Sequence, residues 1–351
     1  MRPFQSPEAP VNCPVEDQFG HRIRYLRVSV TDRCNERCRY CMPQELQEWL
    51  PREGVLSYEE MLRIIRVGTG LGITKIRITG GEPLTRRGIS GFFRELGQIP
   101  GIEDIGVSTN GTLLANRDPA DATRTLAQSL VASGVRTANI SLDTLDRHAY
   151  RSATGRDFLP RALAGIDAAL EAGFEKVKLN AVLMKGQSED QLMPLIAFAR
   201  QKGLLLRFIE LMPVSTNDVL TEENFLPVGL ARRQLESALD RPLVPRPDFT
   251  TNGPATYFEI PGSGGQLVGF IGAMTNLHFC ESCNKLRLTC DGKLRPCLGS
   301  FLEFDILSPL RAGAPDRELA DFFRSVVERK PKEHDFRNNY QPNRKMVAIG
   351  G

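Results

Sequence analysis

The chain carries two groups of three cysteines whose spacing suits iron-sulfur chemistry. Cys34, Cys38 and Cys41 lie in the string TDRCNERCRYCMP, separated by three and then two residues. Three thiolates at this spacing can bind three corners of a 4Fe-4S cube and leave one iron without a protein ligand. An external ligand with an amine and a carboxylate can chelate that iron, and an electron from the cluster can then break a sulfonium bond. A structural zinc site is the alternative, but it normally needs four ligands, and no fourth candidate is nearby.

The second group lies near the end of the chain. Cys280, Cys283 and Cys297 occur in FCESCNKLRLTCDGKLRPCLGS, separated by two and then thirteen residues. They again supply three thiolates, so a second cluster could keep an open iron for a substrate. Cys290 lies among them and could complete a zinc site or a closed cluster, although it follows the alternating run KLRLT of a predicted hairpin. The eighth cysteine, Cys13, stands alone and receives no role.

The elements that position these cysteines follow one recurring unit, which is a helical stretch, a glycine and a short β-rich run. A glycine just past a helix accepts the left-handed conformation that ends it. The helix-ending glycines are Gly72, Gly101, Gly134, Gly173 and Gly203. The predicted strands are residues 25–30, 75–79, 104–109, 136–142, 176–182 and 205–210. Helices and strands that alternate in this way form right-handed βαβ units, so we expect an α/β fold with a parallel, partial (β/α)6 barrel.

Alternation within the predicted strands separates an apolar face from a polar face. The apolar face, which should receive the helices, carries Ile76, Ile78, Ile140, Leu142, Val177 and Leu179. The polar face should line the lumen and carries Arg77, Thr79, Asn139, Ser141, Asp143, Lys178 and Asn180. Buried cations without partners are unfavourable, so an anionic ligand is expected there. The alternatives are that these side chains pair with one another or that the assignment of the faces is wrong.

Composition and patterning divide the chain and limit its function. Residues 1–20 are predicted to be a flexible N-terminal arm, residues 21–244 the barrel, and residues 245–351 a smaller C-terminal domain with the second cluster. The net charge is only +3, and no stretch has the roughly 18 consecutive apolar residues of a membrane helix. We therefore expect neither a nucleic acid nor a membrane as partner. Clustered cysteines in a long chain favour metal ligands in the reducing cytoplasm.

A glycine-rich string lies one strand away from the first cysteine group. Gly80, Gly81, Glu82 and Pro83 close the second predicted strand, and alone they would be an ordinary turn. Together with the cysteine triplet, they resemble the radical S-adenosylmethionine (SAM) superfamily. The resemblance implies that the backbone of this loop binds the amino group of SAM, because glycines allow close approach to the main chain. It also implies contacts to the adenine, ribose and adenosyl parts of SAM from Tyr40, Ser141 and Met212, although the residues alone would make the last two a polar strand residue and core packing.

Longer strings narrow this resemblance to one family. They are LRVSVTDRCNERCRYC, KIRITGGEPL, EKVKLNAVLM, LRFIELM, FCESCNKLRLT, GKLRPCL and the terminal GG. From residue 26 to residue 351 the chain resembles the GTP 3',8-cyclase family of molybdenum cofactor biosynthesis. The resemblance implies that the second cluster is held by Cys280, Cys283 and Cys297, that its open iron holds the guanine, and that Cys290 is not a ligand.

The same resemblance implies which residues contact GTP. They are Arg27, Arg77, Ser108, Lys178, Lys285 and Arg287. Lys285 stands where arginine is typical of the family, which keeps the charge but loses the bidentate fork. Ser108 stands where threonine is usual, which keeps the hydroxyl. The terminal Gly350 and Gly351 are implied to enter the active site and position Arg27 or Arg77, whereas an ordinary C-terminus would fray in solvent.

The implied cofactors are two 4Fe-4S clusters and SAM, and the implied substrate is GTP. SAM would be cleaved to methionine and an adenosyl radical that abstracts the ribose 3' hydrogen, and the carbon radical would attack C8 of guanine. An electron donor such as flavodoxin or ferredoxin would be needed, and the product would pass to the cyclic pyranopterin monophosphate synthase. The family is also compatible with a homodimer.

Two other functions compete with this interpretation. A peptide-modifying radical SAM enzyme with auxiliary clusters usually carries about seven cysteines in its C-terminal region by family resemblance, and this chain has four. A zinc- or cluster-stabilised module for binding nucleic acid is disfavoured by the modest net charge and by the absence of an aromatic-interleaved basic tract.

Overall fold

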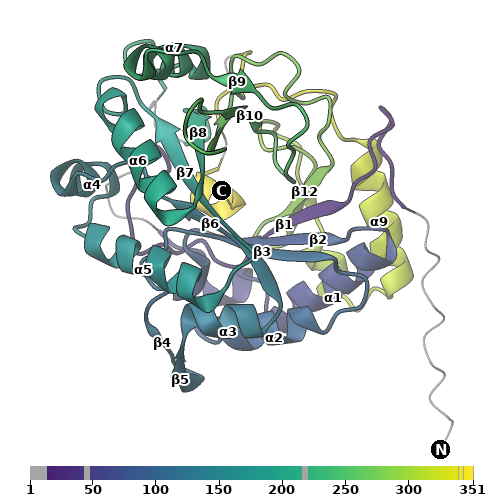
Figure 1. Cartoon of the computed structure of the whole chain (residues 1–351). Helices are drawn as coiled ribbons and strands as arrows, with labels where there is room; N and C mark the ends of the chain where they lie inside the picture. Colours follow the sequence, from purple (N-terminus) through teal and green to yellow (C-terminus); the bar gives the residue numbers. More distant parts are fainter. Residues whose placement is uncertain (1–13, 43–47, 216–219, 339, 343, 351) are drawn as a thin grey trace, which may run out of the picture.

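A computed structural model describes residues 14–42, 48–215, 220–338, 340–342 and 344–350. Its centre is a parallel sheet that curves around a lumen (Figure 1). The parallel strands, in order across the sheet, are β1 (Tyr25–Ser29), β2 (Lys75–Thr79), β3 (Asp104–Thr109), β6 (Val135–Ser141), β7 (Lys176–Leu183) and β8 (Leu205–Glu210). They confirm the six strands predicted from the sequence and the α/β class of partial barrel.

Helices cover the outside of this curved sheet (Figure 1). The helices of the barrel are α1 (Tyr58–Gly70), α2 (Ile89–Gly97), α3 (Leu126–Ala132), α4 (Arg147–Thr154), α5 (Leu159–Ala172), α6 (Leu192–Lys202) and α7 (Val228–Leu239). Their apolar faces meet the apolar face of the strands, where Ile76, Ile78 and Ile140 are at most 1 % exposed. Gly173 and Gly203 end α5 and α6 with positive φ angles of 83° and 65°, as expected of helix-ending glycines. No described helix has the length and apolar character needed to cross a bilayer.

The C-terminal region adds strands to both edges of the barrel sheet. β11 (Leu267–Ile271) pairs in parallel with β8, and β12 (Lys285–Leu288) pairs in parallel with β1. Antiparallel strands continue outward from each of these: β9 (Val244–Pro245), β10 (Thr256–Glu259), β13 (Lys293–Arg295) and β14 (Phe304–Asp305). The register of β12 sets Arg287 beside Arg27 of β1. The second cysteine group therefore flanks strands that continue the barrel, with Cys280 and Cys283 before β12 and Cys297 after β13. The boundary at residue 244 stays a prediction.

The remaining helices follow these strands. They are α8 (Leu307–Arg311), α9 (Asp316–Glu328) and α10 (Met346–Ile349). Short 3-10 turns occur at η1 (Arg52–Gly54), η2 (Pro83–Thr85) and η3 (Glu189–Gln191). A hairpin that was not predicted joins β4 (Arg117–Asp118) to β5 (Asp121–Thr125).

The expectation of a flexible arm is wrong for residues 14–20. Val15 is 5 % exposed, its amide donates to Leu71 O at 3.1 Å, and its carbonyl accepts from Ile23 N at 2.9 Å. The carboxylate of Asp17 accepts from the amides of Phe19 and His21, both at 2.9 Å. A single turn fixed by such contacts has no periodicity that a sequence pattern could show. Residues 1–13, with Cys13, lie outside the described residues.

Candidate active site

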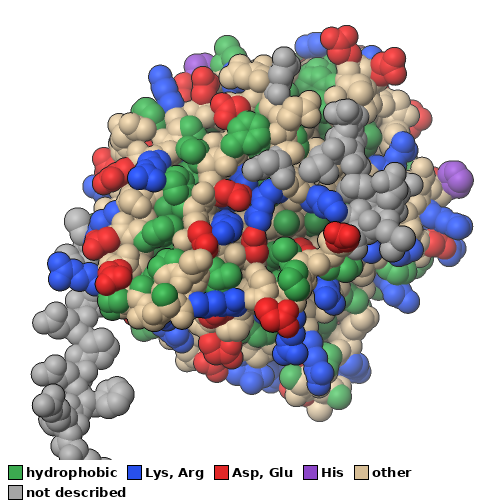
Figure 2. Space-filling view, turned by 180° about the vertical axis from the view of Figure 1, so that it is seen from behind, with side chains coloured by type: hydrophobic (Ala, Val, Ile, Leu, Met, Phe, Trp, Pro, Cys, Tyr) green, Lys and Arg blue, Asp and Glu red, His purple; other side chains and the backbone are tan. Residues whose placement is uncertain are grey.

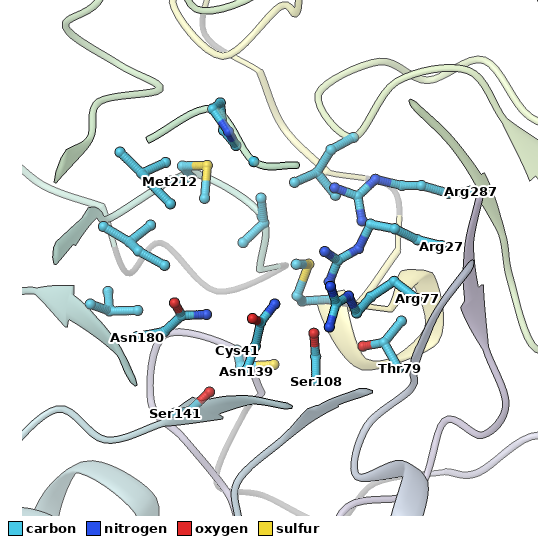
Figure 3. A pocket seen from close by; sticks show the side chains of 18 of the residues that line it. Arg27, Cys41, Arg77, Thr79, Ser108, Asn139, Ser141, Asn180, Met212 and Arg287 are labelled. Carbon is cyan, nitrogen blue, oxygen red and sulfur yellow. The ribbon is translucent and has the colours of Figure 1, made fainter. Parts of the chain in front are cut away.

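One cavity of about 380 Å³ occupies the lumen and brings both cysteine groups together (Figure 3). Of the site residues predicted from the sequence, all except Gly350 and Gly351 line this cavity. Gly350 lies outside the lining, and Gly351 lies outside the described residues. Figure 3 shows Arg27, Arg77 and Arg287 on one side and Met212, Asn180 and Ser141 on the other. The polar face of the strands therefore lines the lumen as predicted, except for Asp143, which lies outside the lining because its carboxylate accepts from the Tyr40 hydroxyl and from Val182 N.

The loop that carries the first cysteine group leaves β1 and is held against α4. Arg37 N donates to Thr154 O at 2.7 Å, and Arg39 N donates to Ala153 O at 3.0 Å. The hydroxyl of Tyr150, in α4, also donates to the buried carboxylate of Glu36. Tyr40 donates from its hydroxyl to Asp143 at 3.0 Å. These contacts fix the loop between the cysteines. The sequence did not predict the pairing of Glu36 with Tyr150, because the two residues are 114 positions apart in the chain.

The first three thiols suit an iron-sulfur cluster. Cys34, Cys38 and Cys41 all face the cavity. Burial raises the pKa of each thiol, and it raises the pKa of Cys41 to about 12. Thiolates would therefore form here only beside a strongly positive partner, and iron provides one.

The donor set of both cysteine groups bears on the zinc alternative. Throughout the described ranges, no group of three or more His, Cys, Asp or Glu side chains is placed to hold a metal ion. Each cysteine group presents three thiols to the cavity. A structural zinc site normally has four protein ligands, whereas three thiolates suit a 4Fe-4S cluster with one open iron.

The glycine-rich loop lies directly on the first cysteine loop. A Cβ at Gly80 would lie 2.7 Å from Thr31 O, and a Cβ at Gly81 would lie 2.4 Å from Arg33 O. Here the glycines allow two backbone segments to touch, which was not the reason expected from the sequence. The carboxylate of Glu82 accepts from Leu84 N, Thr109 Oγ1 and Asn110 N at 2.7 to 3.0 Å, and burial raises its pKa to about 7. Glu82 thus shapes the loop, while its predicted contact with SAM stays a prediction.

The second cysteine group lies at the β12 edge of the cavity. Cys283 N donates to Cys280 O at 3.0 Å, and both residues line the cavity together with Cys297. Burial raises the pKa of Cys297 to about 11. Cys290 is fully buried and lies outside the cavity lining, and burial raises its pKa to about 12. This placement agrees with leaving Cys290 out of the ligand set.

Three cations, from β2, β7 and β8, face the lumen. Arg77 is 2 % exposed and donates to the hydroxyl of Tyr25 at 3.0 Å and to Thr137 O at 3.1 Å, so its hydrogen bonds are partly satisfied. Gly106 makes room for it, because a Cβ there would lie 1.9 Å from Arg77 Nη1. Burial, followed by the charges of Arg207 and Arg77, lowers the pKa of Lys178 to about 7.

Arg207 is the lumen cation that sequence reasoning missed. It is 5 % exposed, lines the cavity, and donates from Nε to Asn180 Oδ1 at 2.9 Å. The signal was present, because Arg207 interrupts the apolar strand LLRFIE at a position of the lumen face. A cavity lined by Arg77, Lys178 and Arg207 favours a polyanionic ligand.

Comparisons with known proteins define the class. Residues 28–199 match the family described as Radical SAM superfamily, and residues 204–336 match Molybdenum Cofactor Synthesis C. The fold resembles Streptococcus suis SuiB bound to precursor peptide SuiA, with a TM-score of 0.59 and 18% identity over 93% of this chain and 75% of that chain. It also resembles native anSMEcpe with bound AdoMet, with a TM-score of 0.58 and 14% identity over 89% and 82%. The fold and the cysteine loop are those of a radical SAM enzyme.

Sequence relatives identify the family within this class. The chain is 45% identical to the GTP 3',8-cyclase of Moorella thermoacetica over 96% of this chain and 100% of that protein. It is 42% identical to the GTP 3',8-cyclase of Thermodesulfovibrio yellowstonii over the same shares, and 44% identical to that of Erythrobacter litoralis over 92% of each chain. The chain belongs to the GTP 3',8-cyclase family. The similarity to the peptide-bound SuiB is far weaker and concerns the fold alone.

Proposed function

We propose that the chain converts GTP to (8S)-3',8-cyclo-7,8-dihydroguanosine 5'-triphosphate, the first step of molybdenum cofactor biosynthesis. One observation carries this proposal: a single cavity joins two three-cysteine groups to a cationic lumen. Membership of the family supports the reaction, and the cations supply the charge that a triphosphate needs.

The residues divide the work of this reaction between three parts of the cavity. Cys34, Cys38 and Cys41 would hold the first 4Fe-4S cluster, and the second group would hold the other. When bound, the first cluster with SAM supplies the one-electron cleavage that gives an adenosyl radical. Tyr40, Ser141 and Met212, together with the loop at Gly80, Gly81 and Glu82, line the part of the cavity proposed for SAM.

The substrate side of the cavity is lined by cations that orient GTP. Arg77, Lys178 and Arg207 approach the lumen from three different strands, so they can hold a triphosphate from several directions. Arg27, Lys285 and Arg287 continue this cationic surface along β1 and β12 toward the second cysteine group. Their role is placement: a reactive carbon held at a fixed distance from its partner reacts without the entropic cost of an encounter.

The decisive experiment is anaerobic incubation of the reconstituted protein with SAM, a reductant and each nucleoside triphosphate in turn. Mass analysis should find a cyclised product from GTP only, together with consumption of SAM. A product from a different nucleotide, or SAM consumption without any nucleotide product, would contradict the proposed substrate.

Removing the Arg77 side chain should weaken GTP binding without changing iron content. Loss of one charge-assisted contact to a bound anion costs about 1.5 to 3 kcal/mol, or roughly 10- to 150-fold in affinity. Equilibrium binding of GTP to Arg77→Ala measures the effect. Lys176→Ala is the control, because Lys176 is an exposed cation at the start of β7. Unaltered affinity in Arg77→Ala would place the triphosphate elsewhere.

GTP affinity should fall as pH rises through 7 because Lys178 loses its charge. Burial lowers the pKa of Lys178 to about 7, so its ammonium is present below that pH and lost above it. Relative to Lys178→Arg, which stays charged, wild-type affinity should fall by up to about tenfold per pH unit between about pH 7 and about pH 8.5. Titration of GTP itself is common to both proteins and cancels. Parallel pH profiles would show that Lys178 does not contact the anion.

The finer assignments of partners and compartment are also proposals. A flavodoxin or ferredoxin would deliver the electron, the cyclic pyranopterin monophosphate synthase would take the product, and the protein would work as a monomer or homodimer in the cytoplasm. The seven described cysteines are all free, which suits a reducing compartment.

A further inference from the structure

A buried lysine lies directly behind the second cysteine group. Lys330 follows the end of α9 and is 3 % exposed. Its backbone is fixed on both sides, because Lys330 N donates to Val327 O at 3.0 Å and Lys330 O accepts from Gln18 Nε2 at 3.3 Å. The backbone of Lys330 is therefore anchored at the end of α9.

All three N–H groups of the Lys330 ammonium have an acceptor. Nζ donates to Cys283 Sγ at 3.5 Å, to Lys285 O at 3.2 Å and to Pro296 O at 2.5 Å. A lysine ammonium has three donors, so this set saturates it. Cys283 and Lys285 belong to the segment that carries Cys280 and Cys283 of the second group. Pro296 directly precedes Cys297, the third cysteine of that group. One side chain thus joins the two separate segments that carry the three thiols.

The charge of Lys330 has no carboxylate partner in these contacts. Its printed acceptors are one sulfur and two carbonyl oxygens. A buried ammonium is unfavourable unless an anion lies beside it, and a cluster with thiolate ligands is such an anion.

We infer that Lys330 is a positioning residue for the second cluster, which aligns its two ligand segments and stabilises its reduced, more negative state. The inference rests on the assignment of a cluster to Cys280, Cys283 and Cys297. Hydrogen bonds to the cluster sulfurs and nearby charges set the reduction potential of iron-sulfur clusters. Removing the positive charge should therefore make the second cluster harder to reduce or prevent its assembly.

The test uses full-length protein in which Cys34, Cys38 and Cys41 are alanine, so that only the second cluster contributes. Lys330→Gln keeps two N–H donors but loses the charge. Lys330→Met loses the N–H donors and the charge, and Lys330→Arg keeps the charge. Lys332→Met is the matched control, because Lys332 is exposed two residues away. Iron and sulfide counting, with a potentiometric titration followed by electron paramagnetic resonance, gives the two readouts.

Lys330→Gln and Lys330→Met should show a more negative midpoint potential or a loss of second-cluster iron. Lys330→Arg and Lys332→Met should stay close to the parent protein. Iron content and potential equal to the parent in Lys330→Gln would overturn the inference. Circular dichroism checks that each variant is folded. If Lys330→Met unfolds, equal midpoint potentials in Lys330→Gln and Lys330→Arg would overturn the inference instead. Neither readout needs GTP, so failure of the proposed reaction would be seen separately.

Discussion

Replacing Cys34, Cys38 and Cys41 with alanine is expected to abolish reductive cleavage of SAM, whereas replacing Cys280, Cys283 and Cys297 should leave cleavage and abolish GTP cyclisation. Both groups line one cavity but come from separate segments: the first from the loop after β1, the second from the segments before β12 and after β13. The two proposed clusters share no cysteine ligand, so removing the thiols of one group should leave the other cluster intact. Adenosyl products and the cyclised nucleotide, measured by mass analysis under anaerobic conditions, separate the two reactions.

Cys290→Ala is the matched control for this experiment. Cys290 is a fully buried thiol in the same hairpin as the second group, but it does not line the cavity. The variant should keep the iron of both clusters and both reactions. Loss of half the iron in Cys290→Ala would show that Cys290 is a ligand. Equal loss of SAM cleavage in the two triple variants would contradict the proposal that only the first cluster cleaves SAM.

Much of the barrel was predictable because its signals are local. Alternation in KIRIT placed Arg77 and Thr79 on one face and Ile76 and Ile78 on the other, and the structure confirms both faces. A strand interior can be inferred from its own residues, since the period of two is built into the backbone. The cysteine triplet was likewise local, because its spacing alone limits which metal centre it can hold.

The structure adds the contacts that depend on distant parts of the chain. No local pattern shows that β12 pairs with β1, or that Lys330 reaches Cys283 across 47 residues. The room that Gly106 leaves for Arg77 depends in the same way on the register of β2 and β3. Strand pairing and close backbone contacts are set by the whole fold, so no local pattern could show the packing of residues 14–20 or the contact of Gly80 and Gly81 with the first cysteine loop.

The C-terminal segment is packed up to the last described residue. Val347 and Ile349 in α10 are 4 % and 2 % exposed, and Arg287 Nη1 donates to Gly350 O at 2.9 Å. Gly350 has a φ of 88°, and a Cβ there would lie 2.8 Å from Thr79 Cγ2 and 2.9 Å from Ser29 Cβ. The segment therefore reaches the ends of β1 and β2, and only glycine fits at this position.

Deleting Gly350 and Gly351, or extending the chain with a tag, should leave both clusters and SAM cleavage intact while GTP cyclisation collapses. The reason is that Gly350 orients Arg287, one of the cations proposed to hold GTP, and does not approach the first cysteine loop in any described contact. Gly350→Ala should have a similar effect, because it adds both a clash and backbone strain. Gly313→Ala is the matched control, since Gly313 also has a positive φ of 85° but its Cβ would meet nothing within 4 Å. Full cyclase activity in the truncated protein would refute this role of the terminus, and loss of SAM cleavage would show that the terminus acts on the first cluster instead.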